Sequence, residues 1–212
     1  MGNSNVKIHE VEQGSEAWIK IRLGRVTSSR IGDILSKGKG GAPSASRKNY
    51  MYQLLLERLT GEMADHYISP EMQRGIEKEQ SAADAYEMQT FNIVERCGFF
   101  ESPDGLMSGS SPDRLVGEDG LIEIKNPNTA THIETIISDN IKKDYIYQMQ
   151  HQMYCSERSW CDFVSYDDRC PVNLRLFIKR IDRDEKMIAE INGEVKLFLS
   201  ELDELEEKVR SL

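Results

Sequence analysis

The hydrophobic pattern of the chain changes near Phe91, and this change limits the folds that the sequence can adopt. Before Phe91, apolar side chains recur at the spacing of amphipathic helices. After it come short runs typical of β-strands, one further helical segment, and a final helical segment over 184–212. Helices on both sides of a set of strands predict an α/β (α+β) fold in which a mixed central sheet is flanked by helices. We expect a single domain over residues 1–212, because neither a repeat nor a long linker divides the chain.

Helical segments are expected where apolar periodicity coincides with N-caps and terminal glycines. They cover residues 16–22, 27–35, 50–59, 70–90, 143–156 and 184–212. Between the second and third, residues 36–49 are rich in glycine and serine and include four basic residues, which predicts a mobile, positively charged surface loop. The last helix carries apolar residues at alternating spacings of three and four, and we expect this seam to pack against the same chain in preference to a partner.

A predicted hairpin over residues 105–125 carries the most informative side chains. Its second arm is an alternating strand in which Glu123 and Lys125 point to one face. The turn at 117–120 would bring Asp113 beside that face. Two carboxylates and an ammonium group then converge at the end of the sheet, and carboxylate oxygens are ligands that suit Mg²⁺. The alternative is an ordinary charged surface hairpin, because an acidic residue followed by Glu-x-Lys is a loose pattern.

Three further features could serve an enzyme that acts on phosphodiesters. Arg22 precedes a predicted helix start that carries the hydroxyls of residues 27–29, where free N–H groups and a guanidinium could bind an anion. Plain capping of that helix explains the same hydroxyls equally well. Glu79 and Gln148 lie within predicted helices, where a solvated polar side chain is the ordinary interpretation.

Charge and composition narrow the class of protein. The chain has 27 basic and 36 acidic residues, a net charge of −9, which argues against a protein that simply coats DNA but allows basic groups to gather in one channel. No apolar run approaches the roughly 20 residues that span a bilayer, so we expect no membrane partner. The four cysteines form no C-x-x-C pair, which predicts reduced thiols and a cytoplasmic location.

Sequence blocks in a fixed order resemble a known family. The blocks are VEQGSEAWIKIRLGRVTSS, RGIEKEQSA, GSSPDRLVGEDGLIEIKNP, YIYQMQHQMY and RDEKMIAEI, which extend from Val11 to about Ile191. They resemble the phage lambda-type exonucleases, that is, the viral recombinase and alkaline exonuclease family of the PD-(D/E)XK nuclease superfamily. The resemblance implies a restriction-endonuclease-like core over most of the chain.

The same resemblance implies an activity and its partners. Such enzymes are Mg²⁺-dependent, processive 5′→3′ exonucleases that degrade one strand of linear double-stranded DNA, prefer a 5′-phosphate, release mononucleotides and leave 3′ overhangs. Mn²⁺ is a possible substitute, and two ions per active site are expected. The implied assembly is a homotrimeric ring that threads DNA through a channel. The implied recombination partner is a single-strand annealing protein that receives the exposed 3′ strand.

The resemblance also implies residue roles. Asp113 and Glu123, with the backbone carbonyl of Ile124, would bind Mg²⁺; Lys125 would orient and help deprotonate the attacking water, assisted by Glu79 and Gln148. The residues expected at DNA are Arg22, Ser29 and Ser111 at the terminal 5′-phosphate, Met72 as an apolar wedge at the duplex end, and Arg47 and Lys48, with Lys37 and Lys39, at backbone phosphates.

Two departures from the family and two alternative functions remain open at this point. Thr131, beside His132, stands where the family type member has a basic residue, which puts one phosphate contact in doubt. The 36–49 segment also differs from the family. A restriction-like endonuclease could be built on the same core, and a catalytically silent module could bind DNA ends. The complete set of acidic residues and lysine argues against the silent module, which needs no such set.

Overall fold

The strands form two mixed sheets in the computed structural model, which describes residues 6–63 and 69–212. The larger sheet has the order β3-β6-β7-β8-β9 and the smaller the order β1-β4-β5-β2. Each sheet is antiparallel except at one parallel pair, β7 with β8 in the larger and β2 with β5 in the smaller. The strands are β1 (Ile8–His9), β2 (Val26–Thr27), β3 (Val94–Glu95), β4 (Phe99–Glu101), β5 (Ser108–Ser110), β6 (Arg114–Val116), β7 (Gly120–Lys125), β8 (Trp160–Tyr166) and β9 (Leu176–Asp182).

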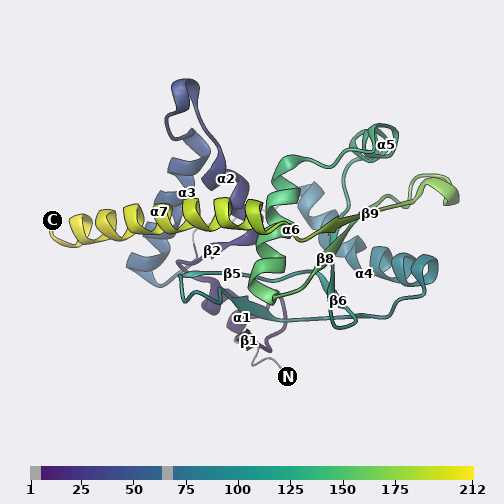
Figure 1. Ribbon diagram of the computed structural model, residues 1–212, viewed down its shortest axis with the longest axis horizontal. Coiled ribbons are helices and arrows are strands. Elements are labelled where there is room, and N and C mark those ends of the chain that lie inside the picture. Colours follow the sequence, from purple (N-terminus) through teal and green to yellow (C-terminus); the bar gives the residue numbers. More distant parts are fainter. Residues whose placement is uncertain (1–5, 64–68) are drawn as a thin grey trace.

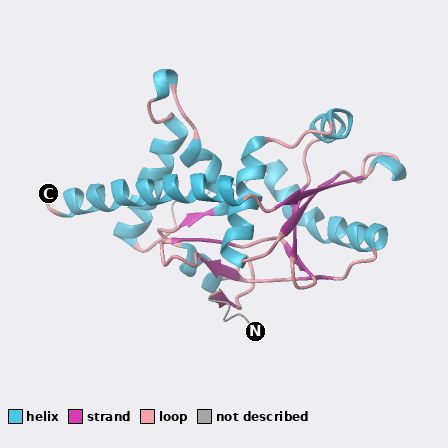
Figure 2. Ribbon diagram, in the orientation of Figure 1, coloured by secondary structure: helices cyan, strands magenta, loops and turns pink. Residues whose placement is uncertain are grey.

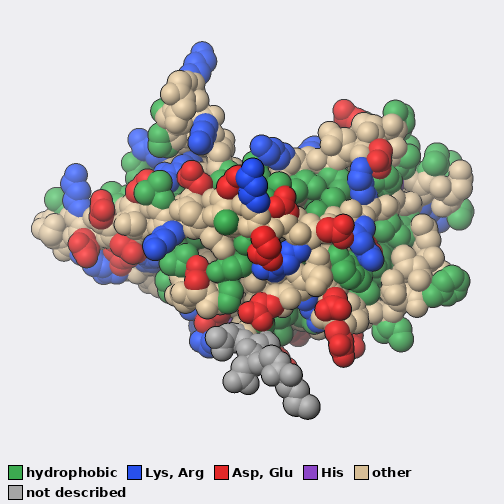
Figure 3. Space-filling view, in the orientation of Figure 1, with side chains coloured by type: hydrophobic (Ala, Val, Ile, Leu, Met, Phe, Trp, Pro, Cys, Tyr) green, Lys and Arg blue, Asp and Glu red, His purple; other side chains and the backbone are tan. Residues whose placement is uncertain are grey.

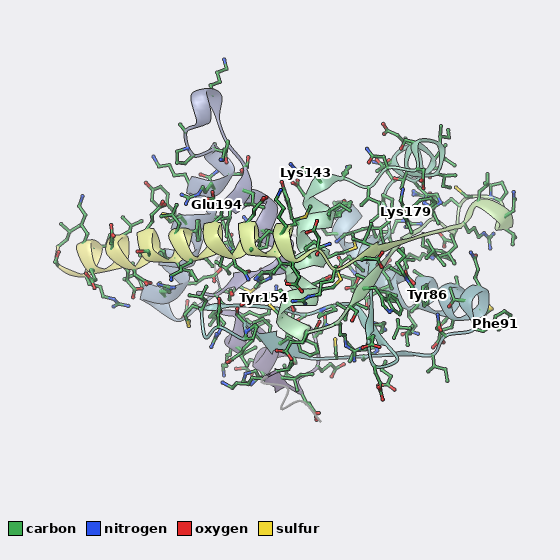
Figure 4. All side chains as sticks on the ribbon, viewed as in Figure 1. Tyr86, Phe91, Lys143, Tyr154, Lys179 and Glu194 are labelled. Atoms are coloured by element: carbon green, nitrogen blue, oxygen red, sulfur yellow. The ribbon has the colours of Figure 1, made fainter. Side chains whose placement is uncertain are left out.

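Helices cover these sheets and join them (Figures 1 and 2). They are α1 (Glu16–Arg22), α2 (Ile31–Leu35), α3 (Ala45–Thr60), α4 (Pro70–Thr90), α5 (Thr129–Ser138), α6 (Lys143–Ser156) and α7 (Glu185–Arg210). α6 contacts β4 and β5 of one sheet and β8 of the other. Tyr154, near the end of α6, lies close to the centre of the view in Figure 4. The predicted α+β class, with helices around mixed sheets, is confirmed.

The larger sheet has α4 on one face and α6 on the other, and successive side chains of β7 point to these two faces in turn. Ile122 and Ile124 pack against Ala83 and Tyr86 of α4. Leu121 packs on the other face with Met149 of α6, and Glu123 shares that face. The strand therefore presents its carboxylate to α6 while its isoleucines complete the core beneath α4, as the alternation predicted.

The C-terminal helix packs within its own chain, as expected. Phe198 of α7 stacks on Tyr50 of α3, with ring centroids 5.6 Å apart, and both side chains are fully buried. Val195 and Leu202 join the same core, together with Ile31 of α2. In Figure 1, α7 runs across the front of the molecule to the C-terminus.

Helix boundaries follow their capping residues, but several differ from the prediction. The helix expected over 27–35 is a 3-10 turn at Ser28–Arg30 followed by α2, and α5 was not expected. Ser15 accepts a hydrogen bond from Trp18 N at the start of α1, and Gly61, in the left-handed region, ends α3. α3, however, begins at Ala45 because the Ser44 side chain caps it, so residues 45–49 are helical and not part of a loop. The shorter segment between α2 and α3 projects from the body of the molecule (Figure 1).

The first arm of the predicted hairpin is also interrupted. β5 pairs within the smaller sheet and β6 within the larger, so the chain leaves one sheet and enters the other through Ser111, Pro112 and Asp113. The hairpin itself is the β6–β7 pair, with Arg114 opposite Ile122. The candidate aspartate therefore lies at the junction of the two sheets. No helix in the described ranges is long and apolar enough to cross a membrane.

Candidate active site

The structure brings Asp113, Glu123 and Lys125 together. Asp113 precedes β6, and its Oδ2 accepts a hydrogen bond from the Ile124 backbone N–H at 2.6 Å. Lys125 Nζ donates to Glu123 Oε1 at 2.5 Å, because the two side chains lie two residues apart on the same face of β7. Strand alternation and the hairpin pairing thus place two carboxylates and an ammonium group at one end of the larger sheet.

Glu123 is held by helix α6 as well as by its own strand. Gln148 Nε2 donates to Glu123 Oε1 at 2.7 Å, and Gln152 Nε2 donates to Glu123 Oε2 at 2.6 Å. Gln148 is also bound to the lysine, since Lys125 Nζ donates to Gln148 Oε1 at 3.2 Å. The ammonium of Lys125 further lies 4.9 Å from the ring centroid of Tyr145 on α6. Both residues of the charge pair are therefore oriented from the same helix.

Sequence reasoning missed Gln152 and Tyr145. It compared Gln148 with Gln150, two residues on, although residues four apart share a face of a helix and residues two apart do not. Gln150 turns away from the site: its amide donates to Asp182 O and accepts from Asp184 N. Spacings of three and four from Gln148 would have indicated both missed residues.

Glu79 reaches the site from α4 through an arginine. Arg114 Nη1 donates to Glu79 Oε1 at 2.6 Å and to the backbone carbonyl of Asp113 at 2.5 Å. Arg114 is buried, whereas the Glu79 side chain is about one-third exposed. Glu79 is thus oriented by an ion pair, and its partner also fixes the backbone that carries Asp113.

The electrostatic environment of the site is strongly acidic. Burial, followed by the neighbouring charges of Glu123 and Glu79, raises the pKa of Asp113 well above its ordinary value. Burial opposes the charged form of Lys125, but Glu123 and Asp113 outweigh it and the pKa of Lys125 is raised. Lys125 is therefore a charged ammonium at neutral pH. The carboxyl groups of Asp113, Glu123 and Glu79 thus face two positive charges, those of Lys125 and Arg114.

These residues fit a small, hard divalent cation. Asp113 and Glu123 supply carboxylate oxygens. The pKa of Asp113 is raised first by burial and then by the charges of Glu123 and Glu79, and a bound cation would favour its ionised form. Within the described part of the chain, no three His, Cys, Asp or Glu side chains form a metal cage. Water and backbone oxygens would have to complete the coordination, and Mg²⁺ tolerates such a site well because it retains several waters.

A second candidate site is a cavity lined by arginines and apolar side chains. This cavity of about 190 Å³ is lined by Arg22, Ser29, Trp18 and Arg30, among others. The Arg22 guanidinium lies 3.8 Å from the centroid of the Trp18 ring, and Trp18 Nε1 donates to Ser111 Oγ at 2.9 Å. Burial lowers the pKa of Arg22 to about 10, which leaves it charged at neutral pH. Three arginines, at positions 22, 25 and 30, line the cavity together with one carboxylate, Glu57, so the balance of charge favours an anion. Ser111 joins the cavity to Asp113 across a single residue.

The remaining candidates are spread over the molecule. Met72 lies half exposed in the first turn of α4. Lys48 is exposed at the start of α3, 5.6 Å from the centroid of the Tyr52 ring. Lys37 and Lys39 are exposed on the projection between α2 and α3, and basic side chains cap its tip in Figure 3.

The structure argues against a DNA contact by Arg47. Its side chain is buried, Nη1 donates to Glu201 Oε2 at 2.6 Å, and the guanidinium faces the ring of Phe198. His132, beside the Thr131 departure, is likewise internal, bonded to Ser165 Oγ and to the carbonyl of Leu174. Arg47 and His132 therefore hold helices against the body of the protein.

Comparison with known families identifies the chain. A model of the YqaJ-like viral recombinase domain matches residues 17–159, most of the chain and nearly all of the site. The chain belongs to the YqaJ-like viral recombinase family. The comparison with curated proteins gives no significant match.

Solved structures agree with this assignment. The YqaJ-like chain is 48% identical to an alkaline exonuclease from Laribacter hongkongensis, with a TM-score of 0.86 over 93% of this chain and 97% of that one. The complex of that exonuclease with dAMP gives a TM-score of 0.87 over the same shares. A phage-related exonuclease from Haemophilus somnus 129PT shares the fold at 18% identity, with a TM-score of 0.72 over 87% and 96% of the two chains. The predicted relationship to lambda-type exonucleases and the predicted fold are confirmed.

Proposed function

We propose that this protein is a DNA exonuclease that uses a divalent cation, preferably Mg²⁺, to hydrolyse the 5′-ended strand of linear double-stranded DNA. It releases mononucleotides and leaves 3′ overhangs. The observation that carries the proposal is the short link between two sites. Ser111 is joined through Trp18 to the cavity of Arg22, and Asp113 lies two residues further on beside Glu123 and Lys125. The segment from Ser111 to Asp113 thus links an end-binding anion site to a hydrolytic site.

Each residue would have a distinct part in this reaction. Asp113, Glu123 and the carbonyl of Ile124 would hold the metal, with two ions expected and Mn²⁺ as a substitute. Bound Mg²⁺ lowers the pKa of coordinated water and offsets charge on a phosphate. Lys125, held by Glu123 and Gln148, donates hydrogen bonds toward the water and the phosphate and stabilises developing negative charge. Glu79, which Arg114 links to the backbone of Asp113, would act as a proton acceptor.

The end of the DNA would be held by the cavity. Arg22 and Ser29 line it and Ser111 borders it, so a terminal 5′-phosphate bound there would fix the register of the first phosphodiester at the carboxylates. Met72 would act as the wedge that separates the last base pair. Lys48, Lys37 and Lys39 would contact backbone phosphates, which carry no sequence information. The dAMP complex of the 48% identical exonuclease supports a mononucleotide product.

We further propose a ring of three chains that degrades DNA processively and passes the 3′ strand to a single-strand annealing protein. A ring places basic residues around a channel, which reconciles DNA binding with the net charge of −9. Light scattering of the purified protein should give three times the chain mass of 24.3 kDa. A monomeric mass under conditions of full activity would contradict the ring.

Digestion of strand-labelled linear duplexes tests the activity. We expect mononucleotides from the 5′-ended strand, faster release from 5′-phosphate than from 5′-hydroxyl ends, and no release in EDTA. A covalently closed circle should remain intact. Cutting of the circle would assign a restriction-like endonuclease instead. Binding to DNA ends without hydrolysis in Mg²⁺ or Mn²⁺ would assign a silent end-binding module.

A further inference from the structure

Two glutamines of helix α6 donate hydrogen bonds to Glu123, and the family resemblance suggested only one of them. Gln148 binds Oε1 and Gln152 binds Oε2, each through a side-chain amide and each at a distance of 2.7 Å or less. Gln152 is fully buried, with 1% of its surface exposed. Each oxygen of the carboxylate thus receives an N–H from the same helix, and the orientation of the carboxylate group is fixed from both ends.

The second glutamine is poorly explained as a packing residue. Its Oε1 atom is buried and has no hydrogen-bond partner among the described residues. Buried polar atoms are normally paired, and each exception needs a reason. Its neighbours Met149 and Met153 are also fully buried and fill the core between α6 and β7 without any polar atom in need of a partner. An apolar side chain at position 152 would therefore pack at least as well, and the amide must be kept for its contact with Glu123.

We propose that Gln152 is a positioning residue that holds Glu123 in the orientation required for the divalent cation, an inference that rests on the proposed function. A carboxylate oxygen has two lone pairs, so an amide hydrogen bond to Oε2 leaves one lone pair for a further ligand. The hydrogen bond also stabilises the ionised carboxylate. Groups that orient metal ligands in this way typically contribute 10- to 100-fold to metal affinity or activity.

The same helix supplies a matched control. Gln150 is about as deeply buried as Gln152, with 2% of its surface exposed, and both its amide nitrogen and its amide oxygen form hydrogen bonds. It connects Asp182 O at the end of β9 with Asp184 N at the start of α7, away from Glu123. Replacing Gln150 therefore removes two hydrogen bonds of the scaffold and none of the candidate site.

The experiment compares Gln152→Met with Gln150→Met. Titration calorimetry with Mn²⁺, without DNA, should show that Gln152→Met weakens metal binding about 10- to 100-fold. The Mg²⁺ concentration for half-maximal hydrolysis should rise by a similar factor. The Tm without metal should also fall, because the buried Glu123 Oε2 loses its donor, so metal affinity is the readout that separates the two variants. Gln150→Met should lower the Tm and leave metal affinity within about twofold of wild type. Gln152→Asn, which keeps an amide but is shorter by one methylene, should weaken metal binding like Gln152→Met.

Several results would overturn the inference. Normal metal affinity in both Gln152 variants would show that the contact with Glu123 does not position a ligand. Failure of both variants to fold would make the amide a requirement of the core and overturn it as well. A wild-type protein that shows no Mg²⁺-dependent hydrolysis would refute the proposed function itself, whereas normal wild-type hydrolysis with unaltered variants would refute the role of Gln152 alone.

Discussion

Lys125 is surrounded by groups that fix its ammonium in place. It donates to Glu123 and Gln148, and it lies over the ring of Tyr145. A fixed charge is effective in catalysis because it needs no reorganisation when negative charge develops on the phosphate. The position of Lys125 therefore matters as much as its charge.

We expect Lys125→Ala to lower kcat for DNA hydrolysis by about 100-fold or more, since one preorganised donor typically contributes that much. Strand-labelled duplexes in saturating Mg²⁺ provide the measurement. Lys208→Ala, an exposed lysine in the last turn of α7, is the control and should hydrolyse DNA like the wild type. Unchanged hydrolysis by Lys125→Ala would refute the assigned mechanism.

Arg22→Gln should reduce the preference for 5′-phosphate over 5′-hydroxyl ends by about 10- to 100-fold, because hydrogen bonds to charged groups contribute roughly 1.5–3 kcal/mol. The ratio of initial rates on the two ends measures this preference. Arg210→Gln removes a surface partner of Glu206 and should keep the wild-type ratio. If Arg22→Gln kept it too, the phosphate site would have to lie elsewhere.

The sequence predicted the placement of side chains correctly where their contacts lie only a few residues away along the chain. Glu123 and Lys125 could be placed on one face because strand alternation alone determines it. Arg47 was misplaced because its partner, Glu201, is 154 residues away, and no local pattern marks a basic residue that turns inward. Gln152 was missed for a different reason: Gln148 was compared with Gln150, although residues four apart share the face of α6 that meets Glu123.

At the scale of elements, α3 and α7 depend on each other. Phe198 fills the space between them against Tyr50, whereas its neighbour Leu197 is about half exposed. We expect Phe198→Ala to lower the free energy of unfolding by about 3–5 kcal/mol and Leu197→Ala by less than about 1 kcal/mol. Urea denaturation measures both, and equal losses would contradict the packing described for α7.

Elements were predictable where a cap or a period marks them. Ser15 and Pro70 mark the starts of α1 and α4, and the alternating three-and-four spacing marks α7. The start of α3 was missed because its first turn has the composition of a loop, and only the Ser44 cap distinguishes it. The division of the strands into two sheets depends on long-range pairing, which no local signal reveals.

At the scale of the molecule, His151 links two regions that must stay together. Its Nδ1 lies 2.8 Å from Ser28 Oγ, which connects α6 with the segment that carries Ser29. Burial lowers the pKa of His151 to about 4, from an ordinary value of 6.5. Between pH 6.5 and about pH 4, His151 binds a proton in the unfolded chain but not in the native state. Its contribution to the free energy of unfolding is therefore fully present above pH 6.5 and is lost as the pH falls toward 4.

We therefore expect His151 to contribute a loss of about 3 kcal/mol in the free energy of unfolding between pH 7 and pH 4. Urea denaturation at a series of pH values measures the slope. His151→Gln keeps a polar group near Ser28 without a proton to gain, so its profile should be flatter by that amount. Identical slopes in the two proteins would show that another group controls acid stability.

Trp18, which contacts Arg22 and donates a hydrogen bond to Ser111, gives the protein a fluorescent reporter at the candidate end-binding cavity. The chain has two tryptophans, and the indole of Trp18 lies under Arg22 at the candidate end-binding cavity, whereas Trp160 lies under Arg180 in the larger sheet. An anion that binds Arg22 changes the charge next to the indole of Trp18 and leaves the environment of Trp160 unchanged. In a Trp160→Phe background, fluorescence should therefore follow the arrival of a DNA end in real time, without a label on either molecule.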